Sequence, residues 1–363
     1  MATLFPQTDP ATDGPECLRD CESCTLAYPR GFKIDDDDAL YGHVKGWSTH
    51  LVVGTGKTDW VRDVADETGS VMEAIKRADA PSNGRLMLSA SNMPTAGDGA
   101  SYADDTTALL LPAFVLVRNL RPANVPQLLR SVVSAAPTTA SPLAPWAPPL
   151  LLGADATGSA SSSPDALPSL CVEACPHSAV ILMCSQRTRD ARCGQSAPLL
   201  RRELERHLRA LGLHRDLDDA RPGGVGVYFV SHVGGHKYSA NVLVYRRPNA
   251  FGLDDEPLPG GVAEAEPRGE EKKEEEEKEE KKEEEEKEEK EEEKEEEEEE
   301  EEEEARDGEA KADVGAAQCI WLARVRPADC ENLVRYTVLR GKVVKPESQL
   351  RGGFDRSRGL LSW

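Results

Sequence analysis

Short runs of hydrophobic residues, each ended by a polar loop, alternate with stretches of helical spacing in the first part of the chain. Apolar runs bounded by Gly, Pro or Asp are typical of buried strands, whereas apolar residues repeated every three or four positions indicate amphipathic helices. The pattern predicts strands over residues 50–53, 85–88 and 108–117, and helices over residues 58–77 and 124–133. Strands that alternate with helices favour an α/β domain.

The same alternation returns after Leu170. The pattern predicts strands over residues 179–183, 225–231, 241–245 and 319–325, and helices over residues 198–213 and 328–339. We expect strand 241–245 to pair with strand 225–231, its neighbour in the chain. This order is compatible with a thioredoxin-like sheet.

Changes in composition divide the chain into segments. Residues 1–16 are polar and predicted to be disordered, and residues 17–134 form the first α/β domain. Residues 135–169 are rich in Pro, Ala and Ser, which is typical of a linker. Residues 170–363 form the second domain, which an acidic low-complexity insert interrupts at 262–314.

The formal net charge of −22 is concentrated in that insert. Residues 270–304 contain 27 Glu and 8 Lys, a net charge of −19, which leaves about −3 for the rest of the chain. Because such a tract cannot bury a core, we expect it to be disordered or to form a partly helical projection. Its acidity argues against a nucleic-acid-binding surface there.

Nine cysteines without a secretory signal fit a reducing compartment better than a disulfide framework. The first basic residue is Arg19, which disfavours a secretory or mitochondrial leader. No apolar run reaches the roughly 18–20 residues that a membrane span requires. The sequence therefore predicts a soluble, cytosolic protein.

Two pairs of metal-ligating residues follow two of the predicted strands. Cys184 and Cys193 flank a polar loop after strand 179–183, and His232 and His236 follow strand 225–231. Two thiolates and two imidazoles at adjacent strand ends suit either one zinc ion or a two-iron cluster. The alternative is that the cysteines are core thiols and the histidines ordinary loop residues.

The spacing of the cysteines helps to choose between the two metal groups. Structural zinc usually uses short knuckles such as C-x2-C, whereas C-x8-C is wide and suits a larger group. One loop carries both cysteines and the other both histidines, which differs from a Rieske centre. Because two thiolates leave such a cluster less negative than four, its reduction potential should exceed that of an all-cysteine ferredoxin. Imidazole ligands can also couple reduction to protonation.

Several strings resemble the sucrase/ferredoxin-like family of fungi and plants. They are the C-x8-C spacing, His-Val-Gly-Gly-His-Lys-Tyr-Ser-Ala-Asn at 232–241, Gly-Thr-Gly-Lys-Thr-Asp-Trp at 54–60, Val-Val-Lys-Pro at 343–346 and Arg-Gly-Gly-Phe at 351–354. The resemblance implies two thioredoxin-like domains, of which the C-terminal one is a thioredoxin-like ferredoxin. It also implies a [2Fe-2S] cluster held by Cys184, Cys193, His232 and His236. The implied function is one-electron transfer in redox homeostasis, by a carrier rather than an enzyme, with an unidentified reductase and electron acceptor.

The final residues, Leu361-Ser362-Trp363, resemble the tripeptide tail by which the cytosolic iron–sulfur targeting complex recognises its clients. A terminal Trp with a free carboxylate is a compact handle for a binding pocket. The resemblance implies that this complex is a partner of the chain. The alternative is an ordinary exposed tail.

The other cysteines allow two further functions. Cys17, Cys21 and Cys24 suit either a metal site or redox thiols, and a Cys21–Cys24 pair would make the chain a thiol oxidoreductase. A zinc-stabilised interaction module is the other alternative. We assign no role to Cys171 and Cys175.

Two remaining features receive structural interpretations. Cys319 and Cys330 are most simply core residues. The string Gly54-Thr55-Gly56-Lys57-Thr58 is not a nucleotide phosphate loop, because Leu51 occupies the position of the first glycine.

Overall fold

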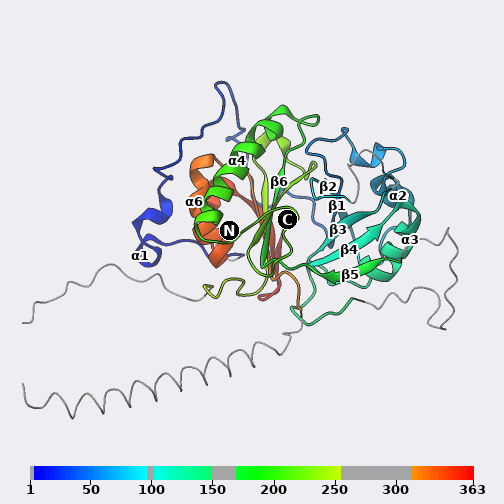
Figure 1. Cartoon of the computed structure of the whole chain (residues 1–363). Helices are drawn as coiled ribbons and strands as arrows, with labels where there is room; N and C mark the ends of the chain where they lie inside the picture. Colours follow the sequence, from blue (N-terminus) through cyan, green and yellow to red (C-terminus); the bar gives the residue numbers. More distant parts are fainter. Residues whose placement is uncertain (1–3, 96–101, 103, 149–168, 255–312) are drawn as a thin grey trace, which may run out of the picture. The chain divides into compact units, whose positions relative to one another are not determined.

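The computed structural model describes residues 4–95, 102, 104–148, 169–254 and 313–363. Within these residues twelve strands form one mixed sheet, flanked by helices, in an α/β arrangement (Figure 1). The strands are β1 (Thr49–Gly54), β2 (Leu86–Ser91), β3 (Thr106–Leu111), β4 (Val115–Leu120), β5 (Cys171–Ala174), β6 (Ala179–Cys184), β7 (His214–Arg215), β8 (Val225–Val230), β9 (Val242–Arg246), β10 (Gln318–Leu322), β11 (Leu350–Asp355) and β12 (Leu360–Ser362).

The sheet repeats one strand order in its two halves. Its path is β12-β11-β10-β9-β6-β8-β2-β1-β3-β4-β5, with β7 beside β8. In the N-terminal half β2 pairs with β1 in parallel, and β1 pairs with β3 and β3 with β4 in antiparallel orientation. In the C-terminal half β8, β6, β9 and β10 follow one another with the same orientations. The predicted pairing of strand 241–245 with strand 225–231 is wrong, because β9 pairs with β6 and β10 while the helical crossover places β8 on the other side of β6.

Helices cover the two halves separately (Figure 1). Turns of 3₁₀ or π type carry the label η. The helical segments are α1 (Pro10–Asp13), η1 (Pro15–Leu18), η2 (Val64–Asp66), α2 (Val71–Arg77), η3 (Pro122–Asn124), α3 (Val125–Gln127), η4 (Leu128–Val133), α4 (Ala191–Ala210), η5 (His236–Tyr238), η6 (Pro327–Asp329), α6 (Cys330–Asn332), η7 (Leu333–Val338) and α7 (Pro346–Gln349).

Three predicted elements have different bounds in the structure. The predicted helix 58–77 is reduced to η2 and α2, because Gly69 adopts a φ of +77° and Ser70 caps a new start. The predicted strand 108–117 is a hairpin of β3 and β4 that turns at Pro112. The predicted helix 198–213 begins earlier, at Ala191, where the Asp190 carboxylate accepts a hydrogen bond from the Arg192 amide as an N-cap.

An internal sequence repeat accompanies the repeated strand order. Arg-Pro-Ala-Asn at 121–124 and Arg-Pro-Ala-Asp at 326–329 each open a 3₁₀ turn that leads into a short α-helix and a π turn. In each copy the Asx side chain of the motif accepts a hydrogen bond from the backbone of its arginine. Repetition of one motif at one structural position indicates that the two halves share a common plan.

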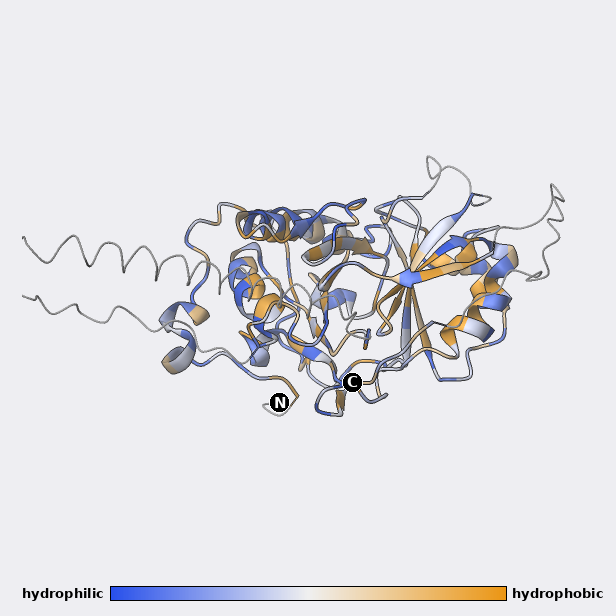
Figure 2. Ribbon diagram, turned by 60° about the horizontal axis from the view of Figure 1, so that its bottom comes forward, coloured by the Kyte–Doolittle hydropathy of each residue, from blue (hydrophilic) through white to orange (hydrophobic). Residues whose placement is uncertain are grey.

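The central strands are largely hydrophobic (Figure 2), and their alternating side chains contribute to separate cores. In β1, Leu51 and Val53 pack with α2 and α3, whereas Val52 points to the opposite face. In β6, Ile181 and Met183 pack against α4, and Val180 and Leu182 join the same cluster as Val52. That shared cluster binds the two halves together through their inner faces.

The structure differs from the predicted segments at the N-terminus and in the linker. Residues 4–16, which we predicted to be disordered, contain α1 and the start of η1, and Leu4 and Phe5 are buried because they complete the core beneath α4. Residues 135–148 of the predicted linker pack on the fold, with Ala136 and Thr139 buried. Residues 149–168 of the linker and 262–312 of the predicted acidic insert lie outside the described residues.

Polar contacts join the halves where the carboxyl ends of β2 and β8 meet. Ser91 pairs with Val230, and the Asn92 side chain accepts a hydrogen bond of 2.8 Å from the Phe229 amide. Farther along, His50 of β1 contacts the Tyr245 hydroxyl of β9 at 3.0 Å through Nδ1. The second nitrogen of this fully buried ring contacts the Ser89 hydroxyl at 2.9 Å.

His50 predicts a pH dependence of stability. Burial lowers the pKa of His50 from 6.5 to about 3, so the folded state keeps the ring neutral where the unfolded chain takes up a proton. The buried ring therefore does not reduce the free energy of unfolding above pH 6.5. As the pH falls from 6.5 towards 3, this free energy decreases by about 1.4 kcal/mol per pH unit. We expect His50→Gln to reduce the slope of unfolding free energy against pH by about one proton between pH 4 and 6. Substitution of the exposed His43 by Gln is the matched control, and equal slopes for His50→Gln and the wild type would contradict the assignment.

Candidate metal centre

The carboxyl ends of β6 and β8 place the first two predicted ligands side by side. Cys184 is the last residue of β6 and His232 lies just beyond β8, and these strands are parallel neighbours. Parallel neighbours present their carboxyl ends at one edge of a sheet, which is where α/β folds commonly bind ligands. Cys184 is only 2 % exposed, and its thiol lies next to the Cys193 thiol and the His232 ring.

Cys193 reaches the same place from a helix. We predicted a loop between the two cysteines, but Cys193 lies in the first turn of α4 and is fully buried. The helix starts early because Asp190 caps it, and the Cys193 amide donates to the Asp190 carbonyl at 3.0 Å. Amide groups in the first turn of a helix favour a nearby negative charge, including a thiolate.

His236 occupies a 3₁₀ turn that a glycine makes possible. The His232 and His236 rings have centroids 5.3 Å apart. Gly235 between them has a φ of +65°, and a Cβ there would lie 2.6 Å from the guanidinium of Arg351. Only glycine meets both the backbone and the steric demand at this position.

The two thiols share their protons unequally. Hydrogen bonds from Cys193 and from His232 lower the pKa of the Cys184 thiol to about 5, against the effect of its burial. The same contact with Cys184 raises the pKa of Cys193. A thiolate and a thiol in contact are therefore arranged to lose the remaining proton when a cationic group arrives.

Asp190 connects the cysteine helix to the second histidine. One of its carboxylate oxygens contacts His236 Nδ1 at 2.9 Å, and Arg192 binds the carboxylate through Nε at 3.0 Å and through a terminal nitrogen at 2.8 Å. These contacts, with that of Arg192 the largest, lower the pKa of Asp190 to about 2. A carboxylate in this position fixes the orientation and tautomer of an imidazole ligand.

Arg351, from the Arg-Gly-Gly-Phe string, supports the histidine loop from behind. Its guanidinium donates to the Gly234 carbonyl at 3.0 Å and to Asn241 Oδ1 at 2.9 Å, and it lies 4.4 Å from the ring centre of Trp321. Burial lowers its pKa to about 10, so it remains a cation at neutral pH. A buried positive charge thus stands next to the predicted ligands.

The N-terminal half supports the cysteine loop through residues 58–61. The Thr58 carbonyl accepts a hydrogen bond from Ser185 at 2.8 Å, and the Asp59 carboxylate accepts two from Thr188, at 3.0 and 2.8 Å. Gln186 donates to the Val61 carbonyl and accepts from the His232 amide at 2.8 Å. The Gly-Thr-Gly-Lys-Thr-Asp-Trp string, which is not a phosphate loop, therefore supports the loop after Cys184, and Gln186 connects that loop to His232.

The four predicted ligands do not form a compact group, because no three of them bring their ligand atoms all within 4.8 Å of one another. Nδ1 of His232 is buried and has no hydrogen-bond partner among the described residues. Because a buried nitrogen without a partner is unfavourable, this donor set fits a bound metal group.

The sequence alone gave no role to several residues that support the predicted ligands. Asp190, Gln186 and Arg351 act through contacts between distant segments, and only the N-cap position of Asp190 carried a local signal. A separate group was missed as well. Among the described residues, Cys21, His207 and Glu331 bring three metal-ligating atoms within 4.8 Å of one another.

The C-terminal residues pair with the sheet. Leu361 and Ser362 belong to β12, which pairs with β11, and the Leu361 side chain is 45 % exposed. The Trp363 ring packs on Trp47 with centroids 4.0 Å apart. A protein that binds this tail would have to displace the ring from Trp47.

No helix in the described part of the chain is long and apolar enough to span a membrane.

Comparison with known proteins gives the family of the chain. The family model described as sucrase/ferredoxin-like matches residues 40–352. Actin patches distal protein 1 of Saccharomyces cerevisiae is 30 % identical over 261 residues, which cover 68 % of this chain and 77 % of the yeast protein. Altered inheritance of mitochondria protein 32 of Clavispora lusitaniae is 42 % identical over 71 residues, 20 % of this chain and 22 % of the relative. No solved structure matches the chain. The matched region contains all four predicted ligands, and the chain belongs to the sucrase/ferredoxin-like family.

Proposed function

We propose that this protein is a one-electron carrier whose [2Fe-2S] cluster is held by Cys184, Cys193, His232 and His236. The observation that carries the proposal is that Cys184 and His232 lie at the ends of two adjacent parallel strands, while Cys193 and His236 follow them in the next turns of the chain. When bound, such a cluster takes up and releases single electrons. The family relation supports the same proposal.

Asp190 gives the site a means to hold a proton. A hydrogen bond from His236 Nδ1 to the Asp190 carboxylate keeps the proton on that nitrogen and leaves Nε2 with a lone pair for a metal. The His236 side chain is 43 % exposed, so this proton can exchange with water. Asp190 therefore fixes the tautomer of His236 and directs Nε2 to the metal.

Charge around the site favours reduction. The Arg351 cation lies behind the histidine loop, and two thiolates bring less negative charge than four. The exposed edge of His236 is where a reductase would approach most closely. Electron transfer to and from protein partners, rather than turnover of a small substrate, is the function that these features favour.

The repeated strand order supports the proposal that each half is a thioredoxin-like domain, with ligands only in the second. In the first half, the corresponding strand ends are followed by the Gly-Thr-Gly-Lys-Thr-Asp-Trp string and by Asn92, which contact the ligand loops or β8 instead. The boundaries at 17–134 and 170–363, a cytosolic location and recognition of the C-terminal tail by the iron–sulfur targeting complex stay predictions.

A comparison of wild type with His236→Cys tests the cluster. We expect oxygen-free protein to be reddish brown with two irons per chain, and to give a rhombic electron paramagnetic resonance signal on reduction. Replacing one imidazole by a thiolate adds negative charge, so the variant should have a shifted signal and a lower potential.

The three possible results of that comparison differ clearly. A colourless wild-type protein with one zinc per chain would contradict the electron carrier and favour a zinc-stabilised interaction module. A signal that is identical in His236→Cys would show that His236 is not a ligand. Exposed His43→Cys is the matched control and should leave the spectrum unchanged.

Asp190→Asn tests the support of the second histidine. Asn still caps a helix but cannot hold the charge that orients His236, so the fold should persist. Loss of such a supporting carboxylate typically weakens metal binding by roughly 10–100-fold. We expect iron to be lost about tenfold faster to a chelator. Asp219→Asn, remote from the site, is the control, and unchanged values in Asp190→Asn would show that Asp190 only caps α4.

A further inference from the structure

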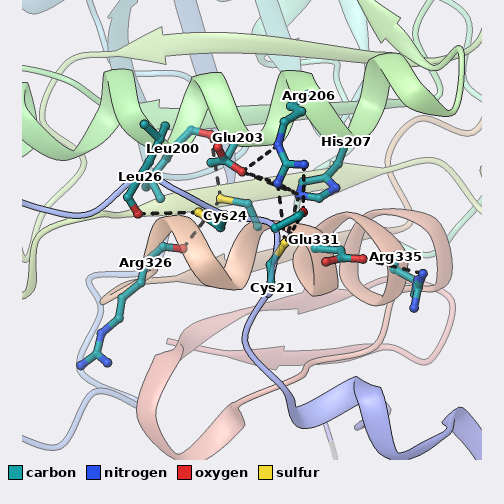
Figure 3. A network of polar contacts seen from close by, with 12 residues as sticks. Cys21, Cys24, Leu26, Leu200, Glu203, Arg206, His207, Arg326, Glu331 and Arg335 are labelled. Carbon is teal, nitrogen blue, oxygen red and sulfur yellow. Dashed lines mark hydrogen bonds and ion pairs between the residues drawn. The ribbon is translucent and has the colours of Figure 1, made fainter.

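We propose that Cys21, His207 and Glu331 form a second metal site, which binds one zinc ion independently of the proposed cluster. The three residues come from the N-terminal segment, from α4 and from α6 (Figure 3). Their ligand atoms all lie within 4.8 Å of one another, and Cys21 Sγ is 3.9 Å from His207 Nε2. A thiolate, an imidazole and a carboxylate are the ligand types that zinc prefers.

The position of Arg206 indicates that the two softer ligands already face a cation. Its terminal nitrogen lies 3.0 Å from His207 Nε2 and 3.6 Å from Cys21 Sγ (Figure 3). Because a guanidinium only donates, Nε2 must be the unprotonated nitrogen of His207, which is the form that binds a metal. The lone pairs of the sulfur and the imidazole therefore converge on one positive group.

Arg206 must leave this point before a metal ion can enter. Its Nε and one terminal nitrogen contact Glu203 at 3.0 and 2.7 Å, and its other terminal nitrogen donates to the Ser23 hydroxyl at 3.1 Å. The Arg206 side chain is 42 % exposed, so its guanidinium can turn to solvent when a metal ion replaces these contacts. A zinc ion would then occupy the position of the guanidinium nitrogen.

Glu331 links the site to an acidic hollow. Its carboxylate lies 3.8 Å from Arg335, a weak contact that leaves an oxygen available. A hollow of about 360 Å³ opens beside it and is lined by Glu16, Arg19, Asp20, Glu22, Ser23, Glu331, Asn332 and Arg335. Four carboxylates against two guanidinium groups make this hollow negative, which favours the entry of a divalent cation.

The site would fasten the N-terminal segment to the C-terminal half. At present Cys21 is joined to that half by a hydrogen bond from its amide to the Ala328 carbonyl at 2.9 Å. Cys24 has the C-x2-C spacing from Cys21, but its thiol is directed to the Leu26 carbonyl at 3.6 Å. Three protein ligands therefore leave the fourth zinc position to a water molecule.

Cobalt binding to the full chain tests the site. The experiment uses a Cys184→Ser/Cys193→Ser background, in which the proposed cluster site has no thiol. We expect one equivalent of Co²⁺ to produce a thiolate-to-cobalt charge-transfer band, and Zn²⁺ to displace it. Cys21→Ser should abolish the band. Circular dichroism of each variant establishes that it is folded.

Single substitutions of the other two proposed ligands and a control complete the test. His207→Gln and Glu331→Gln should each raise the dissociation constant for Co²⁺ at least about tenfold, and Glu331 is partly exposed, so its variant should fold. Substitution of the exposed Cys171 by Ser should change nothing. The proposal is overturned if no Co²⁺ binds, if the band survives in Cys21→Ser, or if Glu331→Gln and His207→Gln bind as tightly as the background protein. None of these results depends on the cluster, so the two proposals fail separately.

Discussion

The structure depends on holding the carboxyl ends of β6 and β8 side by side at the boundary between its halves. A parallel pair joined by α4 brings Cys184, Cys193 and His232 together, but the loops that carry them need support from outside the pair. Gln186 provides much of it, because one side chain contacts both the Val61 carbonyl of the N-terminal half and the His232 amide. The N-terminal half therefore acts as a support for the site although it carries none of the proposed ligands.

Electrostatic contacts complete this support. Asp190 is at once the cap of the helix that carries Cys193, the partner of Arg192 and the partner of His236. Arg351 holds the opposite side of the histidine loop through the Gly234 carbonyl. The set of proposed ligands lies between a carboxylate and a guanidinium, each with a defined contact, and such outer contacts commonly determine the properties of a metal site.

Local patterns were sufficient to predict the central strands of the sheet and to identify four candidate ligands, but they missed β5, β7, β11 and β12 and the way in which the strands assemble. The run at 179–183 is apolar on both faces because β6 is buried between two cores, and its polar end marked Cys184. The position of Cys193 in a helix depended on a single cap, and the pairing of β9 depended on the crossover by α4, so both predictions were wrong. The group of Cys21, His207 and Glu331 joins residues separated by 186 and 124 positions, which no local pattern reveals. The repeated Arg-Pro-Ala-Asx motif, by contrast, is a visible signal in the sequence that the two halves share one plan, and our predictions did not use it.

Mössbauer spectroscopy of protein loaded with isotopically enriched iron tests the central claim most directly. If Cys184 and Cys193 bind one iron and His232 and His236 the other, the oxidised protein must contain two inequivalent ferric sites in equal amounts. The account predicts two quadrupole doublets of equal area, and one of them should change in His236→Cys. A single doublet, as expected for two irons with equivalent ligands, would contradict the segregation of thiolates and imidazoles on which the account rests.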